Sequence, residues 1–262
     1  MMYNADFLIA AVVILLLVLR NFLDQKRAED LNSRVFLFFV VIGILDVIAE
    51  LVSNYYITSG DGDFGLASVV TTTIFYLFQA LLPYALLCYI MALHDNKLIS
   101  VKKMLLAGLA TILLTSIVLT NPFTEKLFYF DVSAGYVEGP WYRLIYYSAL
   151  FHLAVILILV ISWRKEFGPQ KIKVILVILI LCGCGGVIQL LHYSLLMTGF
   201  GMSLGILALF LTINNPNANV GVYPIQHLQE SIRMYHRRTG QTSEVITTVT
   251  CLFNDLKRNS IK

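Results

Sequence analysis

Two carboxylic acids, Asp46 and Glu50, stand four residues apart in the otherwise apolar stretch "GILDVIAELV", residues 43–52. A carboxyl group can hold a proton, a cation or a polar ligand. Residues at positions i and i+4 share one face of a helix. An ionisable residue inside a membrane faces the interior of the helix bundle and finds a polar partner there. The pair therefore predicts a polar site within a bundle.

Depth along each helix predicts the partners, because a helix rises about 1.5 Å per residue. Asp46 is expected near mid-membrane and Glu50 one turn nearer the outside. The expected polar set is Asp46 with Gln79 and His152, and Glu50 with Gln189 and His192. One interpretation is a buried hydrogen-bonded network that fixes helix register. The other is a site for a small polar or cationic ligand, or a proton-sensitive switch. Neither predicts a catalytic residue, a metal site or a cofactor.

The composition indicates which elements position these residues. The 262-residue chain is 58% hydrophobic and 13% charged, whereas a soluble domain is about 25% charged. About 20 apolar residues cross a bilayer as a helix. The sequence predicts an all-α membrane protein, a bundle of seven transmembrane helices, with spans near 5–23, 35–56, 66–93, 104–120, 141–163, 172–192 and 198–213.

Residues 214–262 differ in kind from the membrane domain, residues 1–213. "NNPNAN" is rich in residues that break helices. A helix is predicted from Pro224 to just before Gly240, because Ile225, Leu228 and Ile232 fall at helical spacing. "VITTVTCLF", residues 245–253, has the β-branched and aromatic composition of a strand. We therefore expect a short cytoplasmic α/β tail.

Basic residues predict the orientation. With the N-terminus outside, only Lys126 and Arg143 among the 19 Lys and Arg residues fall outside, and 17 fall inside. Cytoplasmic loops are enriched in Lys and Arg. We expect a multi-pass protein of the plasma or inner membrane, with an outer N-terminus and a cytoplasmic C-terminus. The net charge of +3 then reflects topology and gives no support to nucleic-acid binding.

The longest predicted outer connection, residues 121–140, has the sequence "NPFTEKLFYFDVSAGYVEGP". Aromatic stretches on both sides of "VSAG" predict a small β-hairpin over the bundle. It is either an aromatic belt at the membrane interface or a lid over an outward-facing pocket.

The four cysteines do not predict a disulfide framework. None of them falls in a predicted outer loop, where an oxidising environment would favour disulfides; they are Cys88, Cys182, Cys184 and Cys251. The spacing of Cys182 and Cys184 lacks the two intervening residues of common zinc sites. We expect small side chains buried between helices.

The tail resembles the opening of a diguanylate cyclase (GGDEF) domain. "NVGVYP", residues 219–224, stands where that family has L-T-G-V-Y-N, and "NDLK", residues 254–257, stands near the end of the expected strand. The membrane part resembles the seven-helix sensory regions that precede bacterial GGDEF and histidine-kinase modules. "NPFTEKLFYFDVSAGYVEGPWY", residues 121–142, carries this likeness.

The departures from the GGDEF pattern concern its chemistry. No G-G-[DE]-E-F motif occurs, and Gly185-Gly186, inside a predicted helix, is the only Gly-Gly pair. Leu252 falls where the resemblance places the first metal-binding Asp, and Asp255 is offset from that position. Without the acidic cluster there is no Mg²⁺ clamp for a triphosphate. We expect this chain not to cyclise GTP.

The sequence bears on four classes of function. We expect a sensory module that detects an extracytoplasmic or intramembrane stimulus and passes it to a cytoplasmic output; a transporter of small molecules or ions is the alternative. A retinal photoreceptor is excluded because residues 198–213 contain no lysine. No H-E-x-x-H, nucleophile elbow or phosphate loop indicates an enzyme. The expected partners are membrane lipid and either a second copy of the chain or a cytoplasmic signalling protein.

Overall fold

The computed structural model describes residues 6–24, 30–59, 65–94, 101–131, 135–191 and 197–214. Residues 215–262, which include the predicted helix and strand of the tail, lie outside the described residues, as does His192.

Within the described residues the chain forms seven α-helices and one β-hairpin. Six of the helices are long and apolar enough to cross a membrane, which agrees with a helical, multi-pass membrane protein. The seventh is shorter: twelve α-helical residues continue into a π-helical turn. The helices are α1 (Asp6–Asp24), α2 (Leu31–Ser59), α3 (Leu66–His94), α4 (Val101–Thr124), α5 (Leu144–Ser162), α6 (Arg164–Leu191) and α7 (Thr198–Leu209), with the π turn at Phe210–Asn214.

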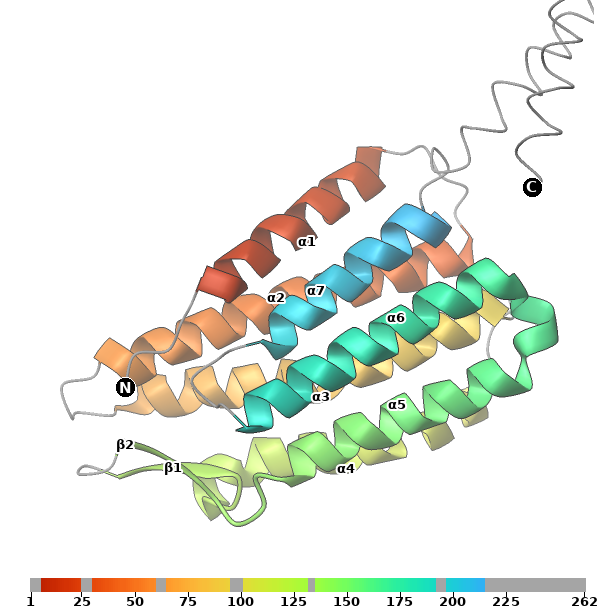
Figure 1. Ribbon diagram of the computed structural model, residues 1–262. Coiled ribbons are helices and arrows are strands. Elements are labelled where there is room, and N and C mark those ends of the chain that lie inside the picture. The colour runs from red at the N-terminus through yellow and green to blue at the C-terminus, as the bar shows by residue number, and fades with distance from the viewer. Residues whose placement is uncertain are drawn as a thin grey trace, which may run out of the picture. The chain divides into compact units, whose positions relative to one another are not determined.

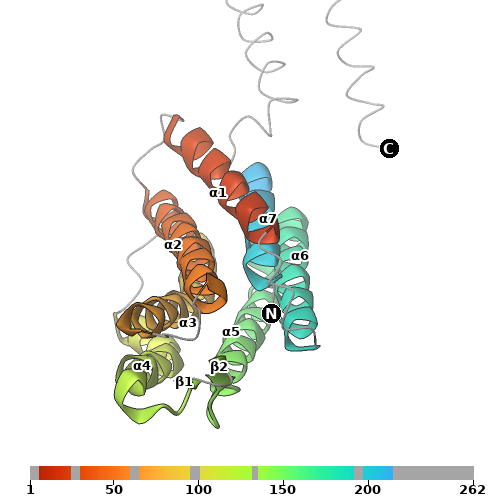
Figure 2. The same cartoon turned by 90° about the vertical axis from the view of Figure 1, so that its left-hand side faces the viewer.

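The helices pack in chain order around the bundle, and α7 returns to the first helix. Figures 1 and 2 show α7 beside both α1 and α6, and the contacts between these elements agree. Helix α3 packs against α2, α4 and α5. Its buried Tyr89 stacks with Phe39 and lies against Phe36, both on α2. Large apolar side chains such as Ile158 and Ile180 are exposed on the outside of the bundle, as expected for surfaces that contact lipid.

Small residues bring α6 and α7 close together. A Cβ atom at Gly201 would lie 2.9 Å from the carbonyl oxygen of Leu181, and one at Gly205 would lie 3.1 Å from Ile178 Cγ1. The Sγ atom of Cys182 also lies 3.6 Å from the Sδ atom of Met202. Gly201 and Gly205 therefore form a G-x-x-x-G face, which lets two membrane helices approach each other.

The cysteine prediction is met at two positions. Cys88 and Cys182 are buried, whereas Cys184, on α6, is exposed. Cys251 lies outside the described residues.

The predicted hairpin forms from β1 (Phe128–Asp131) and β2 (Gly135–Glu138), which pair antiparallel with Phe128 opposite Glu138. Asn121, in the last turn of α4, holds it in place. Its Oδ1 atom accepts a hydrogen bond from the Leu127 N–H at 2.7 Å, and its Nδ2 atom donates one to the Phe128 carbonyl at 3.0 Å. Gly139 follows β2, where a Cβ atom would collide with the backbone of Lys126.

At the opposite end of the bundle, aromatic contacts link the end of α3 to the segment between α5 and α6. The ring of His94, at the end of α3, stacks on Trp163 with centroids 3.9 Å apart and forms an ion pair with Glu166. Gly168 has a φ of 70°, which breaks α6 into two helical parts and is a backbone conformation that glycine adopts without strain. This bend explains why α6 begins before the predicted span at 172.

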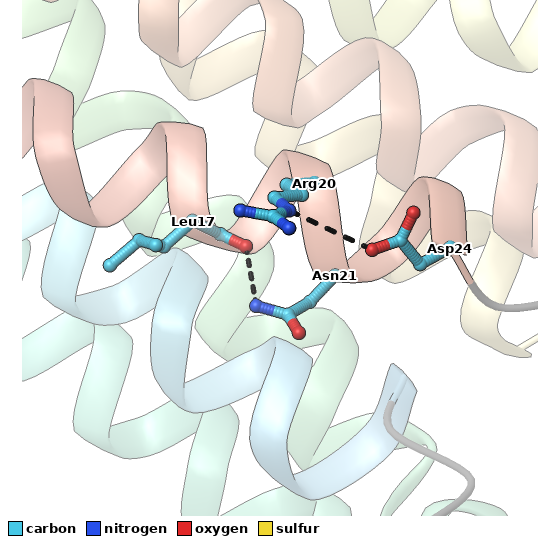
Figure 3. Close-up of polar contacts among 4 residues, drawn as sticks. All are labelled: Leu17, Arg20, Asn21 and Asp24. Atoms are coloured by element: carbon cyan, nitrogen blue, oxygen red, sulfur yellow. Dashed lines mark hydrogen bonds and ion pairs between the residues drawn. The ribbon is translucent and has the colours of Figure 1, made fainter.

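The polar side chains near the end of α1 make local contacts. The Asn21 amide donates a hydrogen bond to the Leu17 carbonyl at 2.8 Å, and Arg20 pairs with Asp24 at 3.9 Å (Figure 3). Arg20 and Asp24 are both exposed, and an exposed ion pair stabilises a folded protein by about 0–1 kcal/mol. Asn21 therefore offers an exposed counterpart to the buried Asn121.

Candidate functional site

The acidic pair lies inside the bundle. Asp46 is 3% exposed and Glu50 is 2% exposed, so neither side chain faces lipid. The Oδ1 atom of Asp46 and the Oε1 atom of Glu50 have no hydrogen-bond partner among the described residues. A buried polar atom without a partner is costly. Such atoms mark a place where a proton, a cation or a polar ligand could be held.

Glu50 faces the first turn of α7. A Cβ atom at Gly199 would lie 3.1 Å from Glu50 Oε2 and 3.2 Å from Val47 Cγ2. A side chain at this position would press against the carboxyl group. The first turn of a helix has free N–H groups and a partial positive charge, which favour a nearby negative charge.

Gln189 reaches the same turn from α6. Its Oε1 atom accepts a hydrogen bond from the Thr198 N–H at 3.0 Å. The Thr198 hydroxyl is itself buried without a partner among the described residues. Polar groups from α2 and α6 thus meet at the start of α7, which brings Glu50 and Gln189 to one element. His192 lies outside the described residues.

Asp46 and Gln79 lie at one level across the interface between α2 and α3. The Ser53 and Thr72 hydroxyls are 2.8 Å apart and fix the register of these two helices. Asp46 and Gln79 each stand seven residues, about two turns, from that pair. They therefore lie at similar depth on the faces that meet. Gln79 Oε1 is buried and has no partner among the described residues.

His152 contacts residues other than Asp46, its expected partner. Its Nδ1 atom donates to the Ser148 carbonyl at 2.7 Å, and its Nε2 atom lies 3.0 Å from the Thr111 hydroxyl. Both ring nitrogens are therefore engaged, and the contact with Thr111 joins α4 to α5. Its ring offers no nitrogen to Asp46.

A cluster of four tyrosines, Tyr76, Tyr136, Tyr142 and Tyr146, was not predicted. The hydroxyls of Tyr76 on α3 and Tyr136 on β2 are hydrogen-bonded, and those of Tyr142 and Tyr146 are 3.3 Å apart. The rings of Tyr76 and Tyr142 lie 6.2 Å apart, edge to face. The tyrosine cluster therefore links the hairpin to α3 and α5.

This cluster extends to the acidic pair. Tyr146 lies within electrostatic range of the Glu50 carboxyl. The spacing of Tyr142 and Tyr146, one helical turn apart, was the available sequence signal.

No metal centre is evident within the described residues, since no three His, Cys, Asp or Glu side chains gather there. Two carboxyls and two amide side chains instead suit a proton or a small polar or cationic group. Comparisons with protein families, curated proteins and solved structures found no match to this chain.

Proposed function

We propose that this protein is a membrane-embedded sensory module that detects an extracytoplasmic or intramembrane stimulus and passes it to a cytoplasmic output. The observation that carries the proposal is the position of Glu50 against the first turn of α7. Helix α7 and its π turn are the last described elements before residues 215–262. A change at the acidic pair would therefore act directly on the helix that leads to the tail.

The tyrosine cluster supplies the other half of the proposed path. It connects β2, at one end of the bundle, to the neighbourhood of Glu50. A stimulus that moves the hairpin, or that changes the charge at Glu50, would favour one position of α7 over another. A stimulus shifts such an equilibrium only through a difference in its interaction with the two states. The cluster and the acidic pair are where such a difference can arise.

The alternative, a transporter, is favoured by one observation. Three buried oxygens, on Asp46, Glu50 and Gln79, have no hydrogen-bond partner among the described residues, and they could hold a cation in transit across the membrane. Transport requires access from both sides in turn. A sensor requires only a change in packing.

The sensory proposal predicts that contact at Glu50 controls the tail. In lipid nanodiscs, we expect Glu50→Ala to change hydrogen–deuterium exchange in peptides from residues 215–262, because the variant removes the carboxyl from the start of α7. Thr111→Ala is the matched control. Thr111 is also buried and polar, but it contacts His152 between α4 and α5. We expect this variant to alter exchange in those helices and to leave the tail unchanged.

Equal effects of the two variants on the tail, or none from Glu50→Ala, would contradict the proposal. Proton flux into liposomes with an imposed membrane potential, followed with a pH-sensitive dye, tests the alternative. A sensor gives no flux above that of protein-free liposomes. Flux that Glu50→Ala abolishes would favour the transporter.

We further propose seven membrane spans, with the N-terminus outside and the C-terminus in the cytoplasm. The charge bias supports this, since Lys126 and Arg143 are the only Lys or Arg among the described residues at the hairpin end. A fluorescent reporter that works only in the cytoplasm is expected to be active when it is fused after Pro216. A second reporter, one that works only in the periplasm, is expected to be inactive at the same position. The reverse pattern would refute the orientation.

A further inference from the structure

A cleft between α4 and α5 lies at the hairpin end of the bundle. Its volume is about 510 Å³, and it is lined by Ile117, Pro140, Trp141, Arg143, Leu144 and Tyr147. Five of these side chains are apolar or aromatic, and Arg143 is the one charged group. The cleft thus combines a cation with a largely apolar wall.

The apolar wall continues toward the middle of the membrane. Leu113 is one helical turn from Ile117 on α4, and Phe151 is one turn from Tyr147 on α5. Residues four apart share a helix face. Leu113 is 58% exposed and Phe151 is 49% exposed. A hydrocarbon chain that entered the cleft would therefore find apolar surface below it.

A second cation lies beside the cleft. The Lys126 Nζ atom is 4.1 Å from the centre of the Trp141 ring, a cation–π contact that holds the ammonium near the cleft wall. Lys126 and Arg143 are also the only Lys and Arg that the described residues place at this end. Both of these described cations thus lie at one cleft.

One acidic residue competes for Arg143. Burial raises the pKa of the Glu138 carboxyl, and the nearby Arg143 guanidinium opposes that rise. Arg143 is therefore shared with an exposed side chain at the end of β2. A bound anion would have to displace or share this interaction, which makes Glu138 a useful test position.

We propose that this cleft binds the headgroup of an anionic phospholipid, with the phosphodiester near Arg143 and Lys126 and an acyl chain along Leu113 and Phe151. The exposed apolar surface below the cleft favours a lipid over a soluble phosphate. The two cations favour an anionic headgroup, such as phosphatidylglycerol, over a zwitterionic one. The site is independent of the acidic pair and does not depend on the proposed sensory function.

Native mass spectrometry of the full chain tests the proposal, with phosphatidylglycerol and phosphatidylcholine of identical acyl chains as probes. We expect preferential retention of phosphatidylglycerol. Replacing both cations, Arg143→Gln with Lys126→Gln, should weaken that binding at least tenfold, which corresponds to about 1.4 kcal/mol, because two charge-assisted contacts to the headgroup are lost. The matched control, Arg164→Gln with Lys165→Gln, removes an exposed Arg and Lys from the opposite end and should leave binding unchanged.

Two further variants separate the headgroup from the cleft itself. Glu138→Gln removes the competing carboxylate and should strengthen phosphatidylglycerol binding. Leu144→Trp keeps both cations but fills the cleft, and it should weaken binding as the double variant does. This variant decides the matter if the double variant fails to fold, as judged by its elution from a sizing column.

Three outcomes would overturn the proposal. Phosphatidylcholine could bind as tightly as phosphatidylglycerol. The Arg164 and Lys165 control could weaken binding as much as the cleft variant. Inorganic phosphate or glycerol phosphate, added in place of lipid, could displace phosphatidylglycerol as well as the intact lipid does, which would identify a soluble anion as the ligand.

Discussion

Asn121→Ala is expected to release the hairpin from the end of α4. Asn121 is 1% exposed, and its side chain bonds both the Leu127 N–H and the Phe128 carbonyl. Alanine would leave these two backbone groups without that partner in a buried place. Each buried group that loses its partner costs about 1–3 kcal/mol. We therefore expect lower thermal stability and faster hydrogen exchange in residues 126–139.

Asn21→Ala provides the matched control. Asn21 has the same side chain and also bonds a backbone carbonyl, but in an exposed position on α1 (Figure 3). The Leu17 carbonyl keeps its helical hydrogen bond once the amide is removed, and so we expect little change in the midpoint of thermal unfolding. Equal midpoints for the two variants, measured in the same detergent, would show that Asn121 does not hold the hairpin.

Gly201→Val is expected to separate α7 from α6. A Cβ atom at this position would lie 2.9 Å from the Leu181 carbonyl oxygen. That obstacle is backbone and cannot rotate away. Overpacking of a close interface costs about 1–3 kcal/mol where neighbouring side chains can adjust, and here the adjustment must come from a whole helix. We expect a lower midpoint of thermal unfolding and faster exchange in α7.

Gly186→Val adds the same two methyl groups to α6 at a glycine whose Cβ atom would meet nothing within 4 Å. The glycine there is free of packing contacts, and so the unfolding midpoint should stay near that of the unchanged protein. A loss of stability as large as that of Gly201→Val would mean that valine disturbs any glycine of these helices, and that the close approach at Gly201 is not the cause.

Hydrophobic segments near 20 residues long were sufficient to predict the helices. The largest differences lie at helix ends. Helix α2 runs from Leu31 to Ser59 and α4 continues through Pro122 to Thr124, beyond the predicted spans. Polar residues at the ends of a membrane helix remain helical without adding to the apolar segment, and hydropathy therefore underestimates the length.

The candidate site was only partly predictable. The sequence gives the depth of a side chain along its helix, but it does not give the neighbouring helix that the side chain faces. Asp46 and Gln79 lie on successive antiparallel helices, where a short connection fixes the neighbour. His152 was assigned by depth alone. Its direction around α5 places it against Thr111, on α4. The order of helices around a bundle decides such pairs, and apolar composition does not encode that order.

The G-x-x-x-G face of α7 was present in the sequence as Gly201 and Gly205 but was not among the predicted features. Its role depends on which helix it meets. The same holds for the tyrosine cluster, whose members come from α3, β2, α5 and the turn before α5. Residues that act through contact between distant segments give no local signal beyond their type.

The return of α7 to α1 has a consequence for synthesis of the protein. Helix α7 supplies the turn that Glu50 faces and the π turn whose Asn214 amide bonds the Tyr89 hydroxyl at 2.9 Å. A ribosome delivers it only after six apolar helices have entered the membrane. Until then the carboxyl of Glu50 has no helix start before it, and α1 lacks one of its two main neighbours. The newly made helices therefore lack these contacts until the last helix closes the bundle.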